Sequence, residues 1–374
     1  MLDFMQADRT RLVDLTAKIL DLERSLSALR IEQAEVQERL DAYSYHILTL
    51  PNELTSEILV RFVPVYPDAP PLTGLASPTT LTHICHRWRE LALATPALWR
   101  AVKFDNNHTS EQMQYISDAW MERSGSCGLS IDIDIDDQRV LDELLLMEPS
   151  TVVDTRSRWE HLKLWVPFSH LHHFATPMPM LRSLDSAMRF SRNTAYSFKD
   201  PVFTEVPQLR TVVLYRNLIP KVTLPWTKLT SLTLNCVGKN RCARILAQTP
   251  NLVLCVLNLA LYDEFGDGGL TPPEQGIVLP CLESMVLTQE NRSRWSMFKG
   301  FNLDSLVVPS LRRLEVQEEF LKPNPVASLQ SFISKSGCAL REVCIIGDII
   351  TDLESYRGAF PSISCSHRIR SSGS

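Results

Sequence analysis

A short apolar phrase that recurs from Trp159 onward constrains the fold of this chain more than any other sequence feature. The phrase is an apolar residue, two variable residues, a second apolar residue, one variable residue and a third apolar residue. Each copy predicts a strand that is too short to fold alone, so neighbouring copies must stack on one another. The copies are Trp159/Leu162/Leu164, Leu209/Val212/Leu214, Leu229/Leu232/Leu234, Leu252/Cys255/Leu257, Leu282/Met285/Leu287, Leu311/Leu314/Val316 and Leu340/Val343/Ile345, with a weaker copy at Leu181/Leu184.

The spacing of these copies predicts a curved parallel sheet and an α/β fold class. The first positions fall at residues 159, 181, 209, 229, 252, 282, 311 and 340, so the steps range from 20 to 30 residues. Such steps lie at or near the 20–29-residue period of leucine-rich repeats. The copies are irregular and lack the consensus asparagine, and little after the last copy resembles a closing cap. We therefore expect a degenerate leucine-rich repeat solenoid over residues 105–365, with a tail at 366–374.

The N-terminal segment is predicted to be one long amphipathic helix. Apolar residues follow one another in steps of three and four, which is the spacing of a coiled-coil seam. Neither proline nor glycine interrupts residues 1–50, and we assign residues 1–48 to this helix. The seam needs a partner, which is either a second copy of the chain or the body of the same chain. Its positions are Leu12, Leu15, Ile19, Leu22, Leu26, Leu29, Gln33, Val36, Leu40, Tyr43 and Ile47.

Three small helices are predicted between residues 51 and 99. The first begins near Pro51, because proline suits the first position of a helix, and it ends before Pro64. The proline-rich stretch 64–80 is predicted to be a loop inserted into this block. The second helix runs from about residue 79 to residue 95, and a short third turn follows it. The many large apolar side chains on such small helices indicate a surface that another molecule covers.

A helix and a strand are predicted between this block and the repeated phrase. The helix covers residues 109–124, and Thr109 with Gln112 at its start matches a capping box. The strand covers residues 129–135, because apolar and polar residues alternate strictly there. Alternation places the isoleucines inward and the aspartates on a solvated face.

Three phrases in the helical block resemble an F-box-like domain. They are LPNEL at 50–54 followed by Ile-Leu at 58–59, ICHRWR at 84–89, and ATPALW at 94–99. Three such phrases in this order are far more specific than any one alone. The surroundings are similar to a large fungal group of F-box-like proteins, which often has an N-terminal coiled coil, a proline-rich interruption in the box and a later "RSGS…L" phrase. That phrase is RSGSCGL at 123–129, where the group more often has proline in place of Gly128.

The resemblance implies that residues 49–104 form an F-box-like domain that docks a Skp-type adaptor. The adaptor would link the chain to a cullin–RING ubiquitin ligase. Trp88 has two interpretations, because it either holds the three helices together or contacts the adaptor. The residues implied to form or support the docking surface are Leu50, Pro51, Leu54, Ile58, Leu59, Ile84, Trp88, Leu98 and Trp99.

Composition and charge exclude several other classes of protein. The net charge of −5 gives no sign of a general affinity for nucleic acid. No apolar run is long enough for a membrane span, and the mixed charges near the N-terminus do not fit a secretory signal. The nine cysteines include no C-x-x-C pair, which predicts reduced, partly buried thiols. We therefore expect the protein in the cytoplasm or the nucleus.

One acidic stretch has the spacing of a calcium-binding loop. Asp132, Asp134, Asp136 and Glu143 occupy positions 1, 3, 5 and 12 of that pattern. Position 6 requires glycine for a sharp turn, but here it is Asp137, and strand-forming isoleucines separate the acids. We interpret the acids as the solvated face of a strand.

No other pattern predicts a catalytic, metal or cofactor site. His83 and His86 have no second ligand pair at a suitable spacing. We interpret the cluster of His170, His172 and His173 as a surface loop. The sequence contains no G-x-S-x-G, P-loop or G-x-G-x-x-G motif. We therefore predict that the protein is not an enzyme and binds no cofactor or metal.

Two hypotheses describe the function. In the first, the protein is a substrate-recognition adaptor of a ubiquitin ligase, and its repeat domain binds a protein target through the solenoid face or through loops, of which residues 263–276 and 289–302 are candidates. In the second, it is a ligase-independent interaction scaffold, and the F-box-like helices only cap the repeats. Exposure of Leu50, Leu54 and Ile58 would favour the first hypothesis, and their burial would favour the second. A third class, a hydrolase with a divergent motif, would require a pocket in which acid, base and nucleophile converge.

Overall fold

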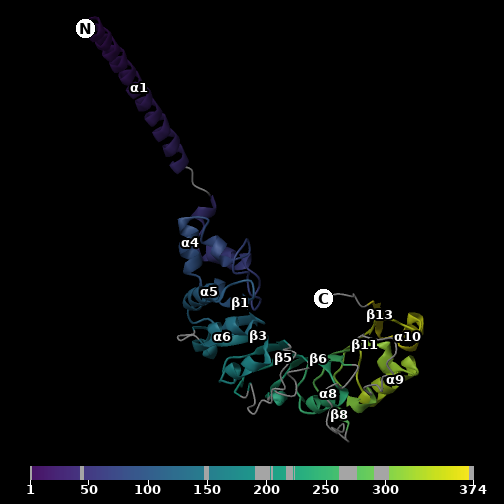
Figure 1. The fold of residues 1–374 in the computed structure, drawn as a ribbon. Coiled ribbons are helices and arrows are strands. Elements are labelled where there is room, and N and C mark those ends of the chain that lie inside the picture. The colour runs from purple at the N-terminus through teal and green to yellow at the C-terminus, as the bar shows by residue number, and fades with distance from the viewer. Residues whose placement is uncertain are drawn as a thin grey trace. The chain divides into compact units, whose positions relative to one another are not determined.

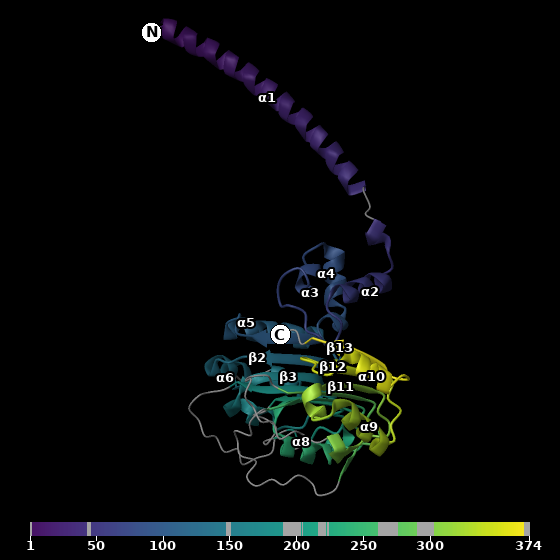
Figure 2. The same cartoon turned by 90° about the vertical axis from the view of Figure 1, so that its right-hand side faces the viewer.

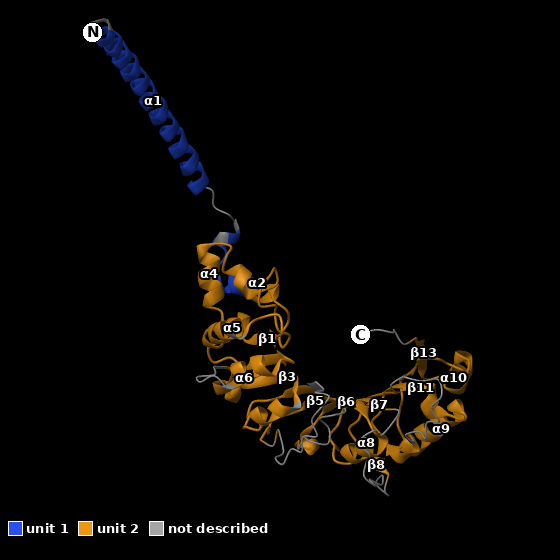
Figure 3. Ribbon diagram, viewed as in Figure 1, with its two compact units in different colours: residues 1–58 blue, residues 59–374 orange. Residues whose placement is uncertain are grey.

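The computed structural model describes residues 2–42, 46–146, 151–189, 205–215, 224–260, 276–289 and 303–369, together with Phe203 and Val222. The chain divides into two compact units, residues 1–58 and residues 59–374 (Figure 3). The boundary falls inside helix α2 (Asn52–Phe62). The first unit is helical, whereas the second combines helices with a large sheet.

Unit 1 consists mainly of one long helix. α1 spans Leu2–Ala42 as a continuous, gently curved helix, and a short 3-10 helix, η1 (His46–Thr49), precedes α2 (Figure 2). The predicted long N-terminal helix is confirmed, although its described part ends at Ala42 rather than at residue 48. The predicted seam residue Tyr43 lies outside the described residues.

Unit 2 is built on a parallel sheet of 11 strands. The strands follow one another in the order of the sequence, and β8 (Ile277–Val278) and β10 (Leu306–Val307) form a separate two-stranded sheet. The strands of the large sheet are β1 (Ala101–Asp105), β2 (Leu129–Asp134), β3 (Trp159–Pro167), β4 (Ser183–Arg189), β5 (Thr211–Tyr215), β6 (Ser231–Val237), β7 (Leu254–Leu259), β9 (Ser284–Gln289), β11 (Arg313–Gln317), β12 (Glu342–Ile346) and β13 (Ser364–Arg368).

The α-helices that follow β1 lie in the connections that parallel neighbours require, whereas α3 and α4 precede the sheet. The sheet is curved; its strands line the inner side and α6, α8 and α9 lie on the outer side (Figure 1). The predicted α/β class with a parallel sheet is confirmed. The α-helices are α3 (Pro78–Leu81), α4 (His86–Leu93), α5 (Ser110–Arg123), α6 (Gln138–Leu146), α7 (Thr151–Asp154), α8 (Lys239–Leu246), α9 (Pro325–Ser336) and α10 (Leu353–Ala359), and the 3-10 helices include η2 (Pro96–Leu98) and η4 (Phe168–Phe174).

The repeated apolar phrase explains which side chains fill the core of unit 2. Its second position is in register from β3 to β12, so that one row of apolar side chains crosses eight strands beneath the helices. Burying each such side chain contributes about 1.5–3 kcal/mol relative to leaving it exposed. The row consists of Leu162, Leu184, Val212, Leu232, Cys255, Met285, Leu314 and Val343, none of which is more than 1% exposed.

The sheet extends beyond the repeated phrase at both ends. β1 crosses the predicted boundary between residues 104 and 105, and β13 continues past residue 365. β13 has only one buried side chain, Cys365, yet it pairs with β12 over five residues. A free sheet edge offers unpaired backbone groups to any extended segment. Backbone pairing therefore adds a strand to the sheet that the apolar pattern does not predict.

Local sequence signals define the ends of several helices. The predicted capping box of α5 is confirmed, because Thr109 Oγ1 accepts a hydrogen bond from the Gln112 amide while Gln112 Oε1 accepts one from the Thr109 amide. α9 begins with Pro325 after the N-cap Asn324 and ends at Ser336, followed by the capping residue Gly337, whose φ of 63° suits glycine.

Candidate functional site

Helix α2 carries two adjacent stripes of residues, one buried and one exposed. On its inner side, Thr55 is 2% exposed and Leu59, one turn later, is fully buried. On its outer side, Leu54, Ile58 and Phe62 are 54%, 43% and 44% exposed. Residues four apart share one helix face, so these three form a continuous apolar stripe in solvent. The inner stripe is sufficient for packing the helix, and the outer stripe is therefore a candidate interface.

The structure separates the nine predicted docking residues into three groups. The buried group can hold the surface in shape but cannot contact a partner, because its side chains are at most 1% exposed. The exposed residues are Pro51, Leu54, Ile58 and Ile84, the partly buried residues are Leu50 and Trp88, and the buried residues are Leu59, Leu98 and Trp99.

The two tryptophans of the F-box-like phrases have structural contacts within unit 2. Trp99 Nε1 donates a hydrogen bond to the Ala92 carbonyl oxygen at 2.8 Å. Its ring packs edge-on against Trp120 at 4.8 Å, and the Arg123 guanidinium lies 4.6 Å from the ring centroid. Trp88 is partly buried and packs against the same hydrophobic core. These contacts favour the interpretation that Trp88 holds the helices together.

The second helix predicted in this block is two helices, so the prediction of one continuous helix is wrong. α3 and α4 are separated by residues 82–85, where Cys85 has an extended backbone with φ −156°. Arg89 Nε donates to the Thr82 carbonyl oxygen at 2.7 Å and holds the break in place. The apolar residues keep a spacing of three and four across the break, which hides it in the sequence. Ile84 lies in this connection and is 55% exposed.

The proline-rich insertion is anchored to the first strands of the sheet. Tyr66 Oη donates a hydrogen bond to Glu160 at 3.0 Å, and the Arg100 guanidinium lies 3.7 Å from the tyrosine ring centroid. Ser130 Oγ on β2 donates to the Pro67 carbonyl oxygen at 2.6 Å. Burial raises the pKa of Tyr66 and the nearby Glu160 carboxylate raises it further, so the phenol remains a donor at neutral pH. The insertion is therefore an integral part of unit 2.

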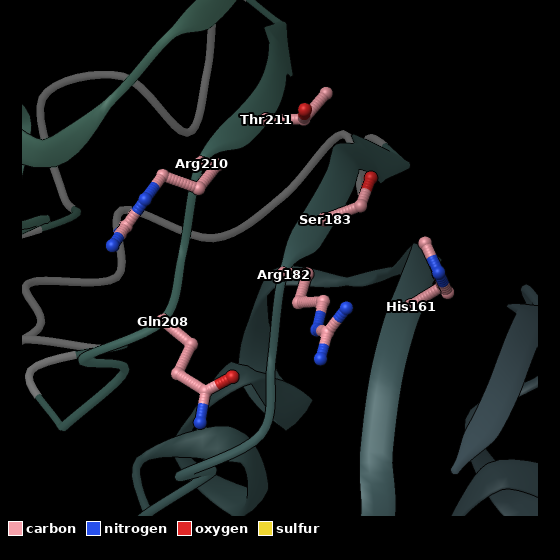
Figure 4. A pocket seen from close by; sticks show the side chains of 6 residues that line it. All are labelled: His161, Arg182, Ser183, Gln208, Arg210 and Thr211. Atoms are coloured by element: carbon pink, nitrogen blue, oxygen red, sulfur yellow. The ribbon is translucent and has the colours of Figure 1, made fainter.

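A pocket of about 420 Å³ lies at the start of three neighbouring strands (Figure 4). His161, Ser183 and Thr211 are in register on β3, β4 and β5. The Arg182 guanidinium points between β3 and the segment that carries Gln208, and it forms no hydrogen bond or ion pair with the residues that the structure describes (Figure 4). Arg210 instead points away from His161 and donates to its neighbouring Leu209 carbonyl oxygen at 2.9 Å.

This pocket has the chemistry to bind an anionic or hydrogen-bonding group of a partner. A guanidinium ion binds carboxylates and phosphates through charge-assisted hydrogen bonds, and the hydroxyls of Ser183 and Thr211 can add neutral ones. Burial lowers the pKa of His161, and the cations Arg182, Arg100 and Lys163 lower it further, so its imidazole is neutral at pH 7. Sequence reasoning missed this site, because it has no motif: its polar residues simply precede or begin the strands.

Charged residues alternate on the open face beside this pocket. Lys103, Asp132, Lys163 and Asp185 are in register on β1 to β4. Burial raises the pKa of both Asp132 and Asp185, so these carboxylates are less solvated than the sequence predicted. Farther along the same row, β5 to β9 present Val213, Thr233, Val256 and Val286. The open face is thus charged at its N-terminal end and uncharged in its middle.

His170 contacts both an acid and a hydroxyl. His170 on η4 lies 2.9 Å from Asp142 Oδ1 through Nε2 and 2.9 Å from Ser169 Oγ through Nδ1. The order of groups resembles a catalytic triad. However, His170 is only 5% exposed, and the pocket of Figure 4 contains none of these residues. We interpret His170 as a buried histidine held by two partners, so the prediction of a surface loop is wrong for this residue.

His173, also on η4, is held neutral at pH 7. Burial and the neighbouring His172 and His170 lower the pKa of His173 to about 4. Within the described ranges, no group of three or more histidine, cysteine or acidic side chains could hold a metal ion. All nine cysteines are free, and Cys242 and Cys255 are fully buried thiols whose pKa is raised by burial.

The loops that were predicted to bind a target lie almost entirely outside the described residues. Apart from Gly276 and Gln289, residues 263–276 and 289–302 lie outside the described residues. None of the helices in the described part of the chain combines the length and apolar character that a membrane span requires. No protein-family model matches this chain, and no curated protein matches it either.

Proposed function

We propose that this protein is a substrate-recognition adaptor of a Skp–cullin–F-box type ubiquitin ligase. The segment from Leu50 to Trp99 would be an F-box-like module that docks a Skp-type adaptor. The sheet of unit 2 would be a degenerate leucine-rich repeat solenoid that binds a protein target. The protein would act in the cytoplasm or the nucleus by bringing a target close to the ligase, which raises its effective concentration without any bond chemistry in this chain.

The outer stripe of α2 carries this proposal. Leu54 and Ile58 are about half exposed, and Leu50 before them is partly exposed, whereas a purely structural cap would bury all three. Fully burying a leucine or isoleucine contributes about 1.5–3 kcal/mol, so a few such side chains can anchor an interface. The stripe also coincides with the opening phrase of the F-box-like resemblance.

The open face of the sheet supports the target-binding half of the proposal. The helices occupy the outer side of the curved sheet, and the inner side is free in the described chain (Figure 1). Its charged N-terminal end carries the pocket around Arg182, whose guanidinium lacks a partner among the described residues. A protein target with an acidic side chain at that point would pair with it.

Co-purification of the full chain with a Skp-type adaptor tests the first half. We expect a stoichiometric complex with the wild type and its loss in Leu54→Ala/Ile58→Ala. The matched control is Leu254→Ala/Ile350→Ala, which removes two aliphatic side chains that are 49% and 76% exposed elsewhere. Circular dichroism establishes that each variant is folded. A folded wild type that binds no Skp-type adaptor, or a control as defective as the α2 variant, would contradict the proposal.

The alternative is a ligase-independent scaffold in which the small helices cap the sheet. The burial of Leu59, Leu98 and Trp99 in the core of unit 2 favours this role for the inner side of the helices. The scaffold hypothesis does not explain why the outer stripe of α2 is exposed. Failure of the co-purification with a folded wild-type chain would favour the scaffold.

A further inference from the structure

Helix α1 leaves a complete apolar seam in solvent. Every side chain described between residues 4 and 42 is exposed, including Leu22 at 68% and Leu29 at 62%. The helix has 41 residues and no glycine or proline, yet helices in water depend mainly on packing of an apolar face for their stability. The seam therefore requires a partner, and its sequence restricts what that partner is.

The seam fits the heptad pattern of a two-stranded coiled coil. Between residues 12 and 40, leucine occupies three of the four d positions, and leucine at d with a polar residue at one a position is typical of dimers. The assignment places Leu12, Ile19, Leu26, Gln33 and Leu40 at a, and Leu15, Leu22, Leu29 and Val36 at d.

Gln33 is the one polar residue in this part of the seam, and it favours one alignment. In a parallel, in-register dimer each a residue faces its own copy, so Gln33 would face Gln33 and the two amides could hydrogen-bond. In an antiparallel dimer a positions face d positions, and Gln33 would be placed against an apolar residue such as Leu22 or Leu29. A buried amide without a partner is costly. The parallel alignment avoids that cost.

The charged residues beside the seam agree with the same alignment. In a parallel dimer, a g position contacts the e position of the next heptad on the partner helix. Lys18 at g would then face Glu23 at e, twice by symmetry. The other such pairs are Arg11 with Thr16, Ser25 with Arg30 and Glu32 with Gln37, and none brings two like charges together.

We propose that α1 forms a parallel, in-register, two-stranded coiled coil with α1 of a second copy of this chain. The seam supplies the affinity, Gln33 fixes the register, and Lys18 with Glu23 favours the in-register pairing. The protein would thus present two copies of unit 2 from one N-terminal stem. This inference does not depend on ligase docking, and each can fail without the other.

The mass of the full chain in solution tests dimerisation. Light scattering at micromolar concentration is expected to give twice the 42.5 kDa of one chain. Leu22→Lys/Leu29→Lys places charges at two d positions and is expected to give a monomer. The matched control Leu20→Lys/Ile31→Lys changes two residues that are 50% and 60% exposed outside the seam, and it is expected to remain a dimer. A monomeric wild type, a larger oligomer, or equal loss in both variants would overturn the proposal.

Energy transfer between dyes attached at the N-terminus tests the orientation. A 41-residue helix is about 60 Å long at 1.5 Å per residue, so parallel helices bring the dyes together and antiparallel helices hold them about that far apart. We expect high transfer efficiency on mixing donor- and acceptor-labelled chains. Low efficiency in a dimer of the correct mass would overturn the parallel arrangement.

The variant Gln33→Leu tests the register. Replacing the buried amide pair by leucine is expected to raise the temperature at which the dimer melts, because a polar residue in the seam lowers stability. It is also expected to reduce the transfer efficiency, because antiparallel pairing no longer carries a penalty. A lower melting temperature would show that Gln33 does not lie in the seam. Co-purification of Leu22→Lys/Leu29→Lys with a Skp-type adaptor separates this result from the proposed function, since the monomeric variant retains Leu54 and Ile58.

Discussion

Regularly spaced leucines occur in both units of this protein, but their exposure is opposite. In α1, Leu12 and Leu22 are each 68% exposed, whereas Leu214 and Leu234 in the sheet are fully buried. Neighbouring strands of unit 2 align their apolar residues on one face of the sheet, and neighbouring helices of the same unit cover that face (Figure 1). A single helix has no such neighbour. Periodicity indicates which side chains share a face. Whether that face is covered within the molecule depends on the other elements of the same chain.

Helix α2 shows the same contrast within 11 residues. Its inner stripe is as buried as the apolar residues of the sheet. Its outer stripe is about as exposed as the seam of α1. The exposed stripes of α1 and α2 are the surfaces for which we propose partners. Buried and exposed apolar residues should therefore differ in their effect on stability.

The largest effect on stability is expected in the core of the sheet. Leu234→Ala would lower the free energy of unfolding by about 2–5 kcal/mol, because it loses burial and leaves a cavity. Leu254→Ala on the next strand removes the same atoms from a side chain that is 49% exposed, and its effect should be within about 0.5 kcal/mol. Urea denaturation of both variants measures the difference. Similar losses in the two would contradict the assignment of the covered and open faces.

A smaller effect on stability is expected from substitution of Glu318, which directly follows β11. Its buried carboxylate accepts hydrogen bonds from the Ile350 and Thr351 amides and from Tyr356 Oη. Burial raises the pKa of Glu318, but these hydrogen bonds outweigh burial and lower it. Glu318→Gln should cost about 1.5–3 kcal/mol at pH 7, since the negative charge is lost and the amide NH2 cannot accept the hydrogen bonds that the second carboxylate oxygen accepts.

The pH dependence of that difference follows from the direction of the shift. A carboxyl whose pKa is lowered by folding stabilises the protein above its ordinary pKa, and this contribution is lost as the pH falls through the folded value. The wild type and Glu318→Gln are therefore expected to converge in stability in acid. Denaturation at several pH values measures this, and a difference that is constant from neutral to acidic pH would show that the charge is not involved.

The smallest effect on stability is expected from the outer stripe of α2. Leu54→Ala and Ile58→Ala should each change the free energy of unfolding by no more than about 0.5 kcal/mol, because the side chains are already in solvent. Thermal denaturation of the double variant measures this. A loss comparable with that of Leu234→Ala would mean that the stripe is part of the core, and the α2 surface would then be no docking site.

The repeated phrase and the helix signals predict much of the fold. All eight copies of the phrase lie at or just before a strand of the parallel sheet, and their apolar residues are buried. The break between α3 and α4 is not predictable in the same way, because the apolar spacing continues across it. The break depends on Arg89 binding the Thr82 carbonyl oxygen, seven residues away.

The candidate site is predictable only in part. The opening phrase indicates which residues belong to the first small helix, but the phrase does not separate Leu54 from Leu59. The helical period puts these two residues on different sides, and only packing decides which side is covered. The pocket around Arg182 has no signature at all, since His161, Ser183 and Thr211 become neighbours through strand pairing across 50 residues of sequence.

By itself the sequence determined the α/β class, the long N-terminal helix and the strand positions of the repeated phrase, because local periodicity decides which side chains can share a face. Only the tertiary structure decided that β1 and β13 join the sheet, that the insertion after Pro64 packs on β2 and β3, and that Glu318 meets Tyr356, 38 residues later. These features depend on hydrogen bonds between distant parts of the chain. Their partners become adjacent only after the strands have paired, so no local pattern encodes them.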